Sequence, residues 1–226
     1  MLAYSSEIYE IETKDIAVLP DGKDKASVAD EIVVKIGDNF DYKKRTLSPD
    51  TLIKGRKLVQ EALRNKQKYL KVRMAFTPKN KWFDFISPII RVLRYRIKAY
   101  GSNTYHLSPK FIRDTRLERN IRTAENAYVF SNPLYRLNEA ERKKTYKKLY
   151  RSMQKNGFND KYPLDIMLCR NMGVKDTLNQ GHHRMSVAME LGLKRVAVVF
   201  SSAGAAPRWL HYIFMKVAKI NMFFKN

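Results

Sequence analysis

The chain has 226 residues, of which 44% are hydrophobic and 12% aromatic, so it can form a packed core as one large domain or two small ones. Its single cysteine, Cys169, excludes an internal disulfide, and a formal net charge of +22 favours anionic partners over basic ones. No stretch approaches eighteen uncharged apolar residues, and the N-terminus lacks the basic-then-apolar pattern of a signal peptide. We therefore expect a cytoplasmic protein without a membrane-spanning helix.

The positive charge is unevenly distributed along the chain. Residues 1–40 contain four lysines and nine acidic residues, whereas residues 41–226 contain forty basic and thirteen acidic residues. Such a field attracts nucleic acid, anionic lipid headgroups, phosphorylated sugars or nucleotides. A lysine-rich surface with no specific partner has the same composition, so charge alone does not select among these.

The first 127 residues have the pattern of an α+β region. Strands are expected near residues 8–12 and 32–36, with a turn at residues 20–23 between them. No internal repeat, low-complexity tract or long linker is evident in the chain.

Residues 48–50, Ser-Pro-Asp, predict the N-cap and first turn of a helix that continues to about Lys68. Apolar side chains then alternate with basic ones over residues 69–76, which predicts a strand with one buried face.

Two segments combine basic and aromatic residues in an amphipathic pattern. They are residues 81–100, around Trp82, and residues 207–226, around Trp209. Helices that lie on a membrane surface have this composition, and so do core helices with arginines on their outer face. Both interpretations remain open from the sequence.

In the second half of the chain, Asn138 predicts the cap of a helix that runs to about Gln154. That helix should end at Asn156-Gly157, because glycine after asparagine is a common helix C-terminus. The apolar run over residues 163–168 then predicts a central strand.

A strand-to-helix junction is expected around Gly181. The apolar spacing over residues 182–191 is helical, and residues 196–200 have the composition of a last buried strand. Met167, Met172, Met185 and Met189 are interpreted as core residues.

The sequence Gly181-His182-His183-Arg184 at this junction suits a phosphate group. Glycine lets the backbone approach a ligand, and the start of a helix offers N–H groups and a positive partial charge. Arg184 supplies a guanidinium that binds oxyanions through two hydrogen bonds, and His182 and His183 can donate hydrogen bonds or transfer a proton near neutral pH.

A structural metal site is not expected from the histidines. His182 and His183 are adjacent at a helix start and point about 100° apart, with no third histidine or cysteine at ligand spacing. His106 and His211 are isolated in the sequence.

These motifs resemble the ParB/sulfiredoxin-like superfamily over about residues 132–200. The matching features are Asn132-Pro133, a helix, Gly157, Pro163-Leu164-Asp165-Ile166, Gly181-His182-His183-Arg184, Ala188, Leu191-Gly192 and Val196-Ala197-Val198. In that superfamily the Gly-x-x-Arg turn holds nucleotide phosphates. The resemblance therefore implies that Gly181, His182, His183 and Arg184 bind ATP or CTP.

The departures from the superfamily narrow the activity. Sulfiredoxins have a cysteine at the position of His182, and partitioning proteins have a helix-turn-helix domain after the module, whereas 26 residues follow Phe200 here. The chain is most similar to members of the free-serine kinase type, some of which carry Asp-Gly-His-His-Arg. Here Gln180 replaces that aspartate.

A base or a Mg²⁺-binding carboxylate must then come from another position. The candidates are Asp176, Asp165, Glu139 and Glu141, of which Asp176 and Glu139 are assigned with His182 and His183 to catalysis. Acidic residues are also favoured at a helix start without any catalytic role, and Asp165 can serve to pair with a lysine.

We expect an α/β (α+β) protein with an N-terminal region (residues 1–127), a ParB/sulfiredoxin-like module with a mixed sheet (128–200) and a basic tail (201–226). The module is expected to bind ATP or CTP, with Mg²⁺ as a further cofactor, and to transfer phosphate to a hydroxyl of a small molecule or of a lipid-linked or surface-polysaccharide acceptor. Contact with the inner face of an anionic membrane would suit the latter acceptors. A nucleic-acid-binding module and a catalytically silent nucleotide sensor are the alternatives.

Overall fold

The computed structural model describes residues 2–22, 31–37, 40–41, 46–47, 49–77, 103–115, 117, 122–127, 137–168 and 175–202. The two basic aromatic segments, Cys169, Met172 and the Asn132-Pro133 motif lie outside the described residues.

The described residues form an α+β fold with mixed sheets, as the sequence predicts. The first half contains β1 (Ala3–Glu12), α1 (Thr13–Ala17), β2 (Ile32–Lys35), β3 (Phe40–Asp41), β4 (Thr46–Leu47), β5 (Thr51–Lys54), α2 (Arg56–Arg64) and β6 (Tyr69–Phe76). The second half contains β7 (Tyr105–Leu107), α4 (Pro109–Asp114), α5 (Glu139–Asn156), β8 (Leu164–Leu168), β9 (Thr177–Gln180), α6 (His182–Glu190) and β10 (Val196–Ser202).

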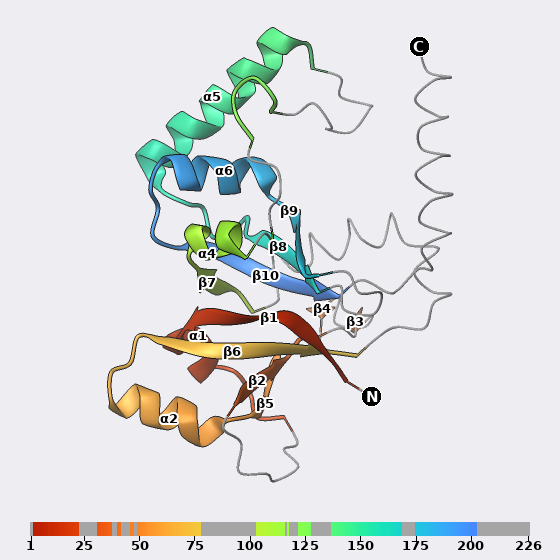
Figure 1. The fold of residues 1–226 in the computed structure, drawn as a ribbon, viewed down its shortest axis with the longest axis vertical. Helices are drawn as coiled ribbons and strands as arrows, with labels where there is room; N and C mark the ends of the chain where they lie inside the picture. Colours follow the sequence, from red (N-terminus) through yellow and green to blue (C-terminus); the bar gives the residue numbers. More distant parts are fainter. Residues whose placement is uncertain are drawn as a thin grey trace, which may run out of the picture.

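Two four-stranded sheets form the centre of the molecule, in the orders β1-β6-β2-β5 and β7-β10-β8-β9. In Figure 1 the two sheets lie one above the other along the long axis of the molecule. Their edge strands β1 and β7 lie side by side where the sheets meet. Helix α1 packs beside α2, and α4 packs beside α6 (Figure 1). Strand β7 therefore belongs to the second sheet, although it lies within the region 1–127 that the sequence separates from the module.

The two sheets repeat the same topology. In each, the first strand is antiparallel to the last, the last is parallel to the second, and the second is antiparallel to the third. The register is also the same, because Val72 faces Tyr9 and Ile32 in the first sheet, and Val198 faces Tyr105 and Leu164 in the second. The expectation of no internal repeat is thus wrong at the level of structure.

Once the structure aligns the halves, the repeat is also visible in the sequence. Seven residues of the first half recur unchanged 126 positions later. They are Asp50, Thr51, Leu52, Gly55, Ala62, Lys68 and Val72, which correspond to Asp176, Thr177, Leu178, Gly181, Ala188, Lys194 and Val198. The turn after each helix also recurs, in backbone shape only. That turn has a left-handed backbone at Lys66 (φ 53°) in the first half and at Gly192 (φ 65°) in the second.

Two buried tyrosine–aspartate hydrogen bonds join the halves reciprocally. The Tyr9 hydroxyl in the first half donates to Asp176 of the second at 2.7 Å, and the Tyr105 hydroxyl in the second half donates to Asp50 of the first at 2.7 Å. Burial, and secondly the Asp50 carboxylate, raise the pKa of Tyr105 well above its usual value, so this phenol remains a donor.

Each aspartate also uses its backbone N–H in the same reciprocal contact. The Asp176 N–H donates to the Ser6 hydroxyl at 3.0 Å, and the Asp50 N–H donates to the Asn103 side-chain oxygen at 3.0 Å. These bonds hold the residue before β9 and the residue before β5 against the opposite half of the molecule.

The same contacts explain why no helix starts at residues 48–50. Asp50 directs its carboxylate to the Gly37 N–H and the Tyr105 hydroxyl rather than to a first helical turn. The chain then forms β5, and the helix begins only at Arg56, after Gly55. The strand over residues 69–76 is confirmed.

Helix α5 begins as the sequence predicts. Asn138 accepts a hydrogen bond from the Glu141 N–H, and the Glu141 carboxylate accepts one from the Asn138 N–H, so that both donors are satisfied. The helix extends to Asn156 and is followed by Gly157, as expected.

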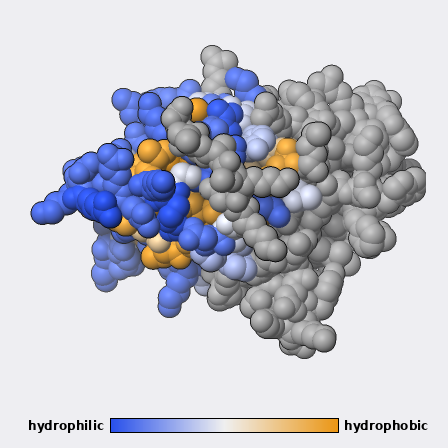
Figure 2. Space-filling view, turned by 90° about the horizontal axis from the view of Figure 1, so that it is seen from below, coloured by the Kyte–Doolittle hydropathy of each residue, from blue (hydrophilic) through white to orange (hydrophobic). Residues whose placement is uncertain are grey.

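The buried apolar side chains of both sheets form one continuous core. Ile16 in α1 and Ile112 in α4 occupy equivalent positions and are both fully buried, so each stabilises the fold by about 1.5–3 kcal/mol relative to an exposed side chain. Figure 2 shows that polar side chains cover most of the described surface at the lower end of the molecule. None of the described helices combines the length and the apolar composition that crossing a bilayer requires.

Replacing either interlocking tyrosine with phenylalanine should destabilise the protein. Tyr9→Phe and Tyr105→Phe each remove a donor from a buried carboxylate, so each should lower the free energy of unfolding by about 1.5–3 kcal/mol in urea denaturation. Tyr162→Phe, at an exposed position, is the control and should change it by less than about 0.5 kcal/mol. A loss at Tyr9 or Tyr105 no larger than at Tyr162 would contradict the interlock.

Candidate functional site

The candidate phosphate-binding turn lies where β9 meets α6. Gly181 is the N-cap of α6 and has a left-handed backbone (φ 95°), which a residue with a side chain rarely adopts. As a glycine it has no side chain to cap the helix, and the first turn of α6 contains no acidic residue. The first N–H groups of a helix have no acceptor within the helix, so this end of α6 has the polarity that an anion requires.

Glycine is also required at position 181 by close packing. A Cβ atom there would lie 2.4 Å from the Leu164 Cδ2 atom, and Leu164 is fully buried at the start of β8. The equivalent Gly55 has the same constraint against Ile32, the counterpart of Leu164. The turn is therefore a feature of the repeated scaffold as well as a candidate site.

Arg184 lies against the turn. Its Nη2 atom donates to the Pro163 carbonyl at 3.3 Å and lies 3.2 Å from the position that a Cβ of residue 181 would occupy. The guanidinium also lies 6.0 Å from the centre of the Phe158 ring. The Arg184 guanidinium is thus held beside the backbone of Gly181.

His182 and His183 open α6 and are both partly exposed. The structure therefore brings together all four residues of the predicted turn, Gly181, His182, His183 and Arg184. This arrangement can bind an oxyanion by backbone N–H groups, a guanidinium and imidazole donors.

Asp176 does not lie at this turn. It precedes β9, whereas Gly181 follows it, so about 16 Å of extended chain separates the two. Its carboxylate is buried and accepts hydrogen bonds from the Tyr9 hydroxyl and the Ser6 N–H. We therefore assign Asp176 to the contact between the halves.

Glu139 and Glu141 are at the start of α5, whose 18 residues span about 27 Å. The turn is near the other end of that helix, because Phe158, which follows α5, contacts Arg184. A hydrogen bond from the Lys143 ammonium at 2.7 Å lowers the pKa of the exposed Glu139 carboxyl. Glu141 completes the helix cap described above.

Asp165 is buried in β8 and has two hydrogen-bond donors. Asn179 donates to it at 2.8 Å and the Ser201 hydroxyl at 2.6 Å. Asp176, Glu139 and Glu141 thus do not reach the turn. Asp165 lies opposite Gln180, the residue before Gly181, but its carboxylate is engaged by Asn179 and Ser201.

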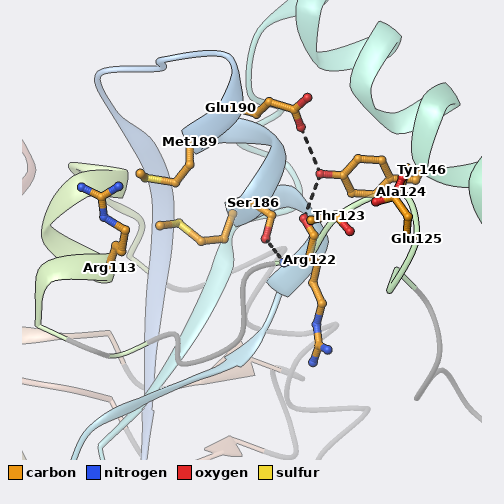
Figure 3. A pocket seen from close by; sticks show the side chains of 10 residues that line it. Arg113, Arg122, Thr123, Ala124, Glu125, Tyr146, Ser186, Met189 and Glu190 are labelled. Carbon is orange, nitrogen blue, oxygen red and sulfur yellow. Dashed lines mark hydrogen bonds between the residues drawn. The ribbon is translucent and has the colours of Figure 1, made fainter.

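A pocket of about 500 Å³ lies along the same helix (Figure 3). Its lining residues are Arg113, Arg122, Thr123, Ala124, Glu125, Tyr146, Met185, Ser186, Met189 and Glu190. Figure 3 shows the Tyr146 hydroxyl between the Glu190 carboxylate, at 3.2 Å, and the Arg122 carbonyl oxygen, at 3.1 Å. No sequence motif marks this pocket, because its residues come from four separate segments.

His106 is not isolated in the fold. Its Nδ1 atom lies 3.0 Å from an Asp15 oxygen, and its Nε2 atom lies 3.3 Å from an Asp160 oxygen. The hydrogen bond to Asp15 is the main cause that raises the pKa of His106 above its usual value. The three residues are far apart in the sequence, so no motif identified them.

Comparison with known proteins gives no relative: no family model, no curated protein and no solved structure matches the chain.

The close packing at the turn predicts that substitution by alanine destabilises the protein to different extents at two glycines with left-handed backbones. Gly192→Ala should lower the free energy of unfolding by about 1–2 kcal/mol from its backbone conformation alone, because no atom lies within 4 Å of its Cβ position. Gly181→Ala should cost more, since the new methyl group meets Leu164. Equal losses in urea denaturation would mean that the contact with Leu164 imposes no constraint on the turn.

Proposed function

We propose that the second half of the chain binds the phosphate groups of a nucleotide, ATP or CTP, at Gly181-His182-His183-Arg184. The observation that carries the proposal is the geometry of the turn, in which a side-chain-free glycine opens α6 and the Arg184 guanidinium lies beside it. Backbone N–H groups, helix polarity and a guanidinium are the combination that binds phosphate in proteins.

The contrast with the equivalent turn in the first half supports this assignment. At Gly55 the following residue is Arg56, whose guanidinium binds the Asp21 carboxylate and, at 2.7 Å, the Leu19 carbonyl oxygen. Arg56 therefore tethers the segment after α1 to α2. The two turns share a backbone but differ in what their arginines contact, and the turn at Gly181 is the better candidate for a ligand.

Phosphoryl transfer to a hydroxyl group is the proposed activity. The turn would stabilise negative charge on the transferred group, and His182 or His183 can move a proton. A carboxylate is still needed to orient the acceptor or to hold Mg²⁺. Asp176 and Glu139 lie elsewhere, whereas Asp165 lies beside the turn with its carboxylate hydrogen-bonded to Asn179 and Ser201.

A catalytically silent nucleotide sensor is the second candidate function. It is favoured by the engagement of the candidate carboxylates in other contacts. Gln180 stands before the glycine and the candidate carboxylates are engaged in structural contacts, so the described residues supply phosphate-binding groups at the turn without an uncommitted carboxylate. Transfer of labelled phosphate from ATP to an acceptor in the presence of Mg²⁺ separates the enzyme from the sensor.

A nucleic-acid-binding module remains the alternative of a different class. The forty basic residues after residue 40 supply a positive field for a polyanion, and a lipid-linked acceptor at an anionic membrane surface would use the same field. Nucleic-acid binding differs from the favoured proposal in needing many dispersed lysines rather than one arginine.

Arg184→Ala should weaken nucleotide binding, because it removes a charge-assisted hydrogen bond to phosphate. The expected loss is about 1.5–3 kcal/mol, or roughly 10- to 150-fold in Kd, measured by titration calorimetry with ATP and CTP, with and without Mg²⁺. Arg56→Ala, at the equivalent turn, is the matched control and should leave the affinity unchanged.

Unchanged affinity in folded Arg184→Ala protein would remove the basis for the phosphate site. Nanomolar affinity for a defined DNA or RNA at about 150 mM salt, retained in Arg184→Ala, would favour the nucleic-acid module, because many lysines then share the contact.

A further inference from the structure

The seam between the two halves is the place where β1 lies beside β7. It holds a cluster of acidic side chains around one histidine. Glu12 is the last residue of β1, Asp15 lies in α1, and His106 lies in β7 of the other half. One ligand atom from each of these three residues lies within 4.8 Å of the other two. We propose that Glu12, Asp15 and His106 bind a divalent transition-metal ion that connects the two halves.

The burial of the cluster supports a cation. The relative solvent exposure of the side chain is 11% for Glu12, 9% for Asp15 and 23% for His106. Two carboxylates at such depth require compensating positive charge, which proteins supply with a basic side chain or a metal ion. The partial exposure of His106 leaves a path by which an ion can enter.

The orientation of the imidazole suits a metal ligand. The Asp160 carboxylate lies 3.3 Å from Nε2, on the side of the ring away from Asp15. Nδ1 faces Asp15 and Glu12, so a metal ion that replaces the proton shared by Nδ1 and Asp15 is ligated by Nδ1 while Nε2–H donates to Asp160. Metal-binding histidines commonly donate their second ring N–H to a carboxylate in this manner, which fixes the tautomer and the ring.

Lys14 forms an ion pair with one of the three ligands, Glu12. Its ammonium lies 2.7 Å from a Glu12 oxygen, while 71% of its side chain is exposed. An exposed ion pair of this kind contributes little stability, so a divalent ion can displace the ammonium at small cost.

The repeat shows that the cluster is not part of the duplicated scaffold. The positions equivalent to Glu12, Asp15 and His106 are Ser108, Phe111 and Glu10. Glu10 pairs with Arg195 at 3.2 Å, so the equivalent place on the opposite side holds a simple ion pair. Among the described residues, a histidine and two carboxylates come together on only one of the two equivalent sides of the seam.

The ligand types indicate which ions would bind. Carboxylate oxygens combined with one imidazole suit Mn²⁺ and Zn²⁺ better than Ca²⁺, which takes oxygen ligands. Three protein ligands leave further coordination positions to water.

The test uses the full chain and the metal alone. Titration calorimetry with ZnCl₂ and MnCl₂ should give one saturable site, and absorption of the Co²⁺-loaded protein should report a nitrogen–oxygen ligand set. Asp15→Asn and His106→Ala should abolish the site. Asp160→Asn should weaken it about 10- to 100-fold, the usual effect of losing the carboxylate behind a metal-binding histidine. Lys14→Met should strengthen it, because the competing ammonium is gone.

The paired histidines at the turn require a control, since they can bind Zn²⁺ by themselves. The double variant His182→Ala/His183→Ala should keep the site, and Glu10→Gln, at the equivalent position across the seam, should keep it as well. Metal binding that survives both Asp15→Asn and His106→Ala, or no saturable binding to unsubstituted protein, would overturn the proposal. In the second case His106 would be a protonated bridge between Asp15 and Asp160 without a metal.

Discussion

The reciprocal hydrogen bonds from Tyr9 to Asp176 and from Tyr105 to Asp50 are the contact on which the rest of the structure depends. Each aspartate stands directly before the third strand of its sheet, and that strand leads to the glycine that opens the following helix. A buried carboxylate without its donors would be strongly destabilising, so both halves must be present for either strand to be held in place. The position of the Gly181 turn is therefore set partly by a residue of β1, more than 170 positions away along the chain.

The repeated scaffold makes the differences between the halves informative. Where the first sheet has the apolar residues Val33, Ile53 and Ala75, the second has the hydrogen-bonded group Asp165, Asn179 and Ser201. Where Arg56 tethers a neighbouring segment, Arg184 lies beside the glycine turn. The polar group of the second sheet lies next to the turn that we propose as the ligand site, because Asp165 pairs with Gln180, while the first sheet has the same topology with apolar side chains at these positions.

Local signals in the sequence predicted local structure well. The Asn138 cap, the strand over residues 69–76 and the strand-to-helix junction at Gly181 depend on neighbouring residues, and each is present. The start of the helix expected at residue 49 was wrong, because the Asp50 side chain, expected in the first turn, instead bonds across the molecule to Tyr105. The repeat, the role of Asp176 and the surroundings of His106 depend on contacts between distant segments. Seven matches over one offset are too sparse to find without the structure.

The most direct test of the central claim follows backbone amide signals in ¹H–¹⁵N spectra during titration with ATP. The account predicts that the largest shifts occur at residues 181–184, with little change at the equivalent residues 55–58, because the two turns share a backbone and differ in their side-chain contacts. Shifts centred on residues 55–58, or dispersed over exposed lysines with no saturation, would contradict a phosphate site at Gly181.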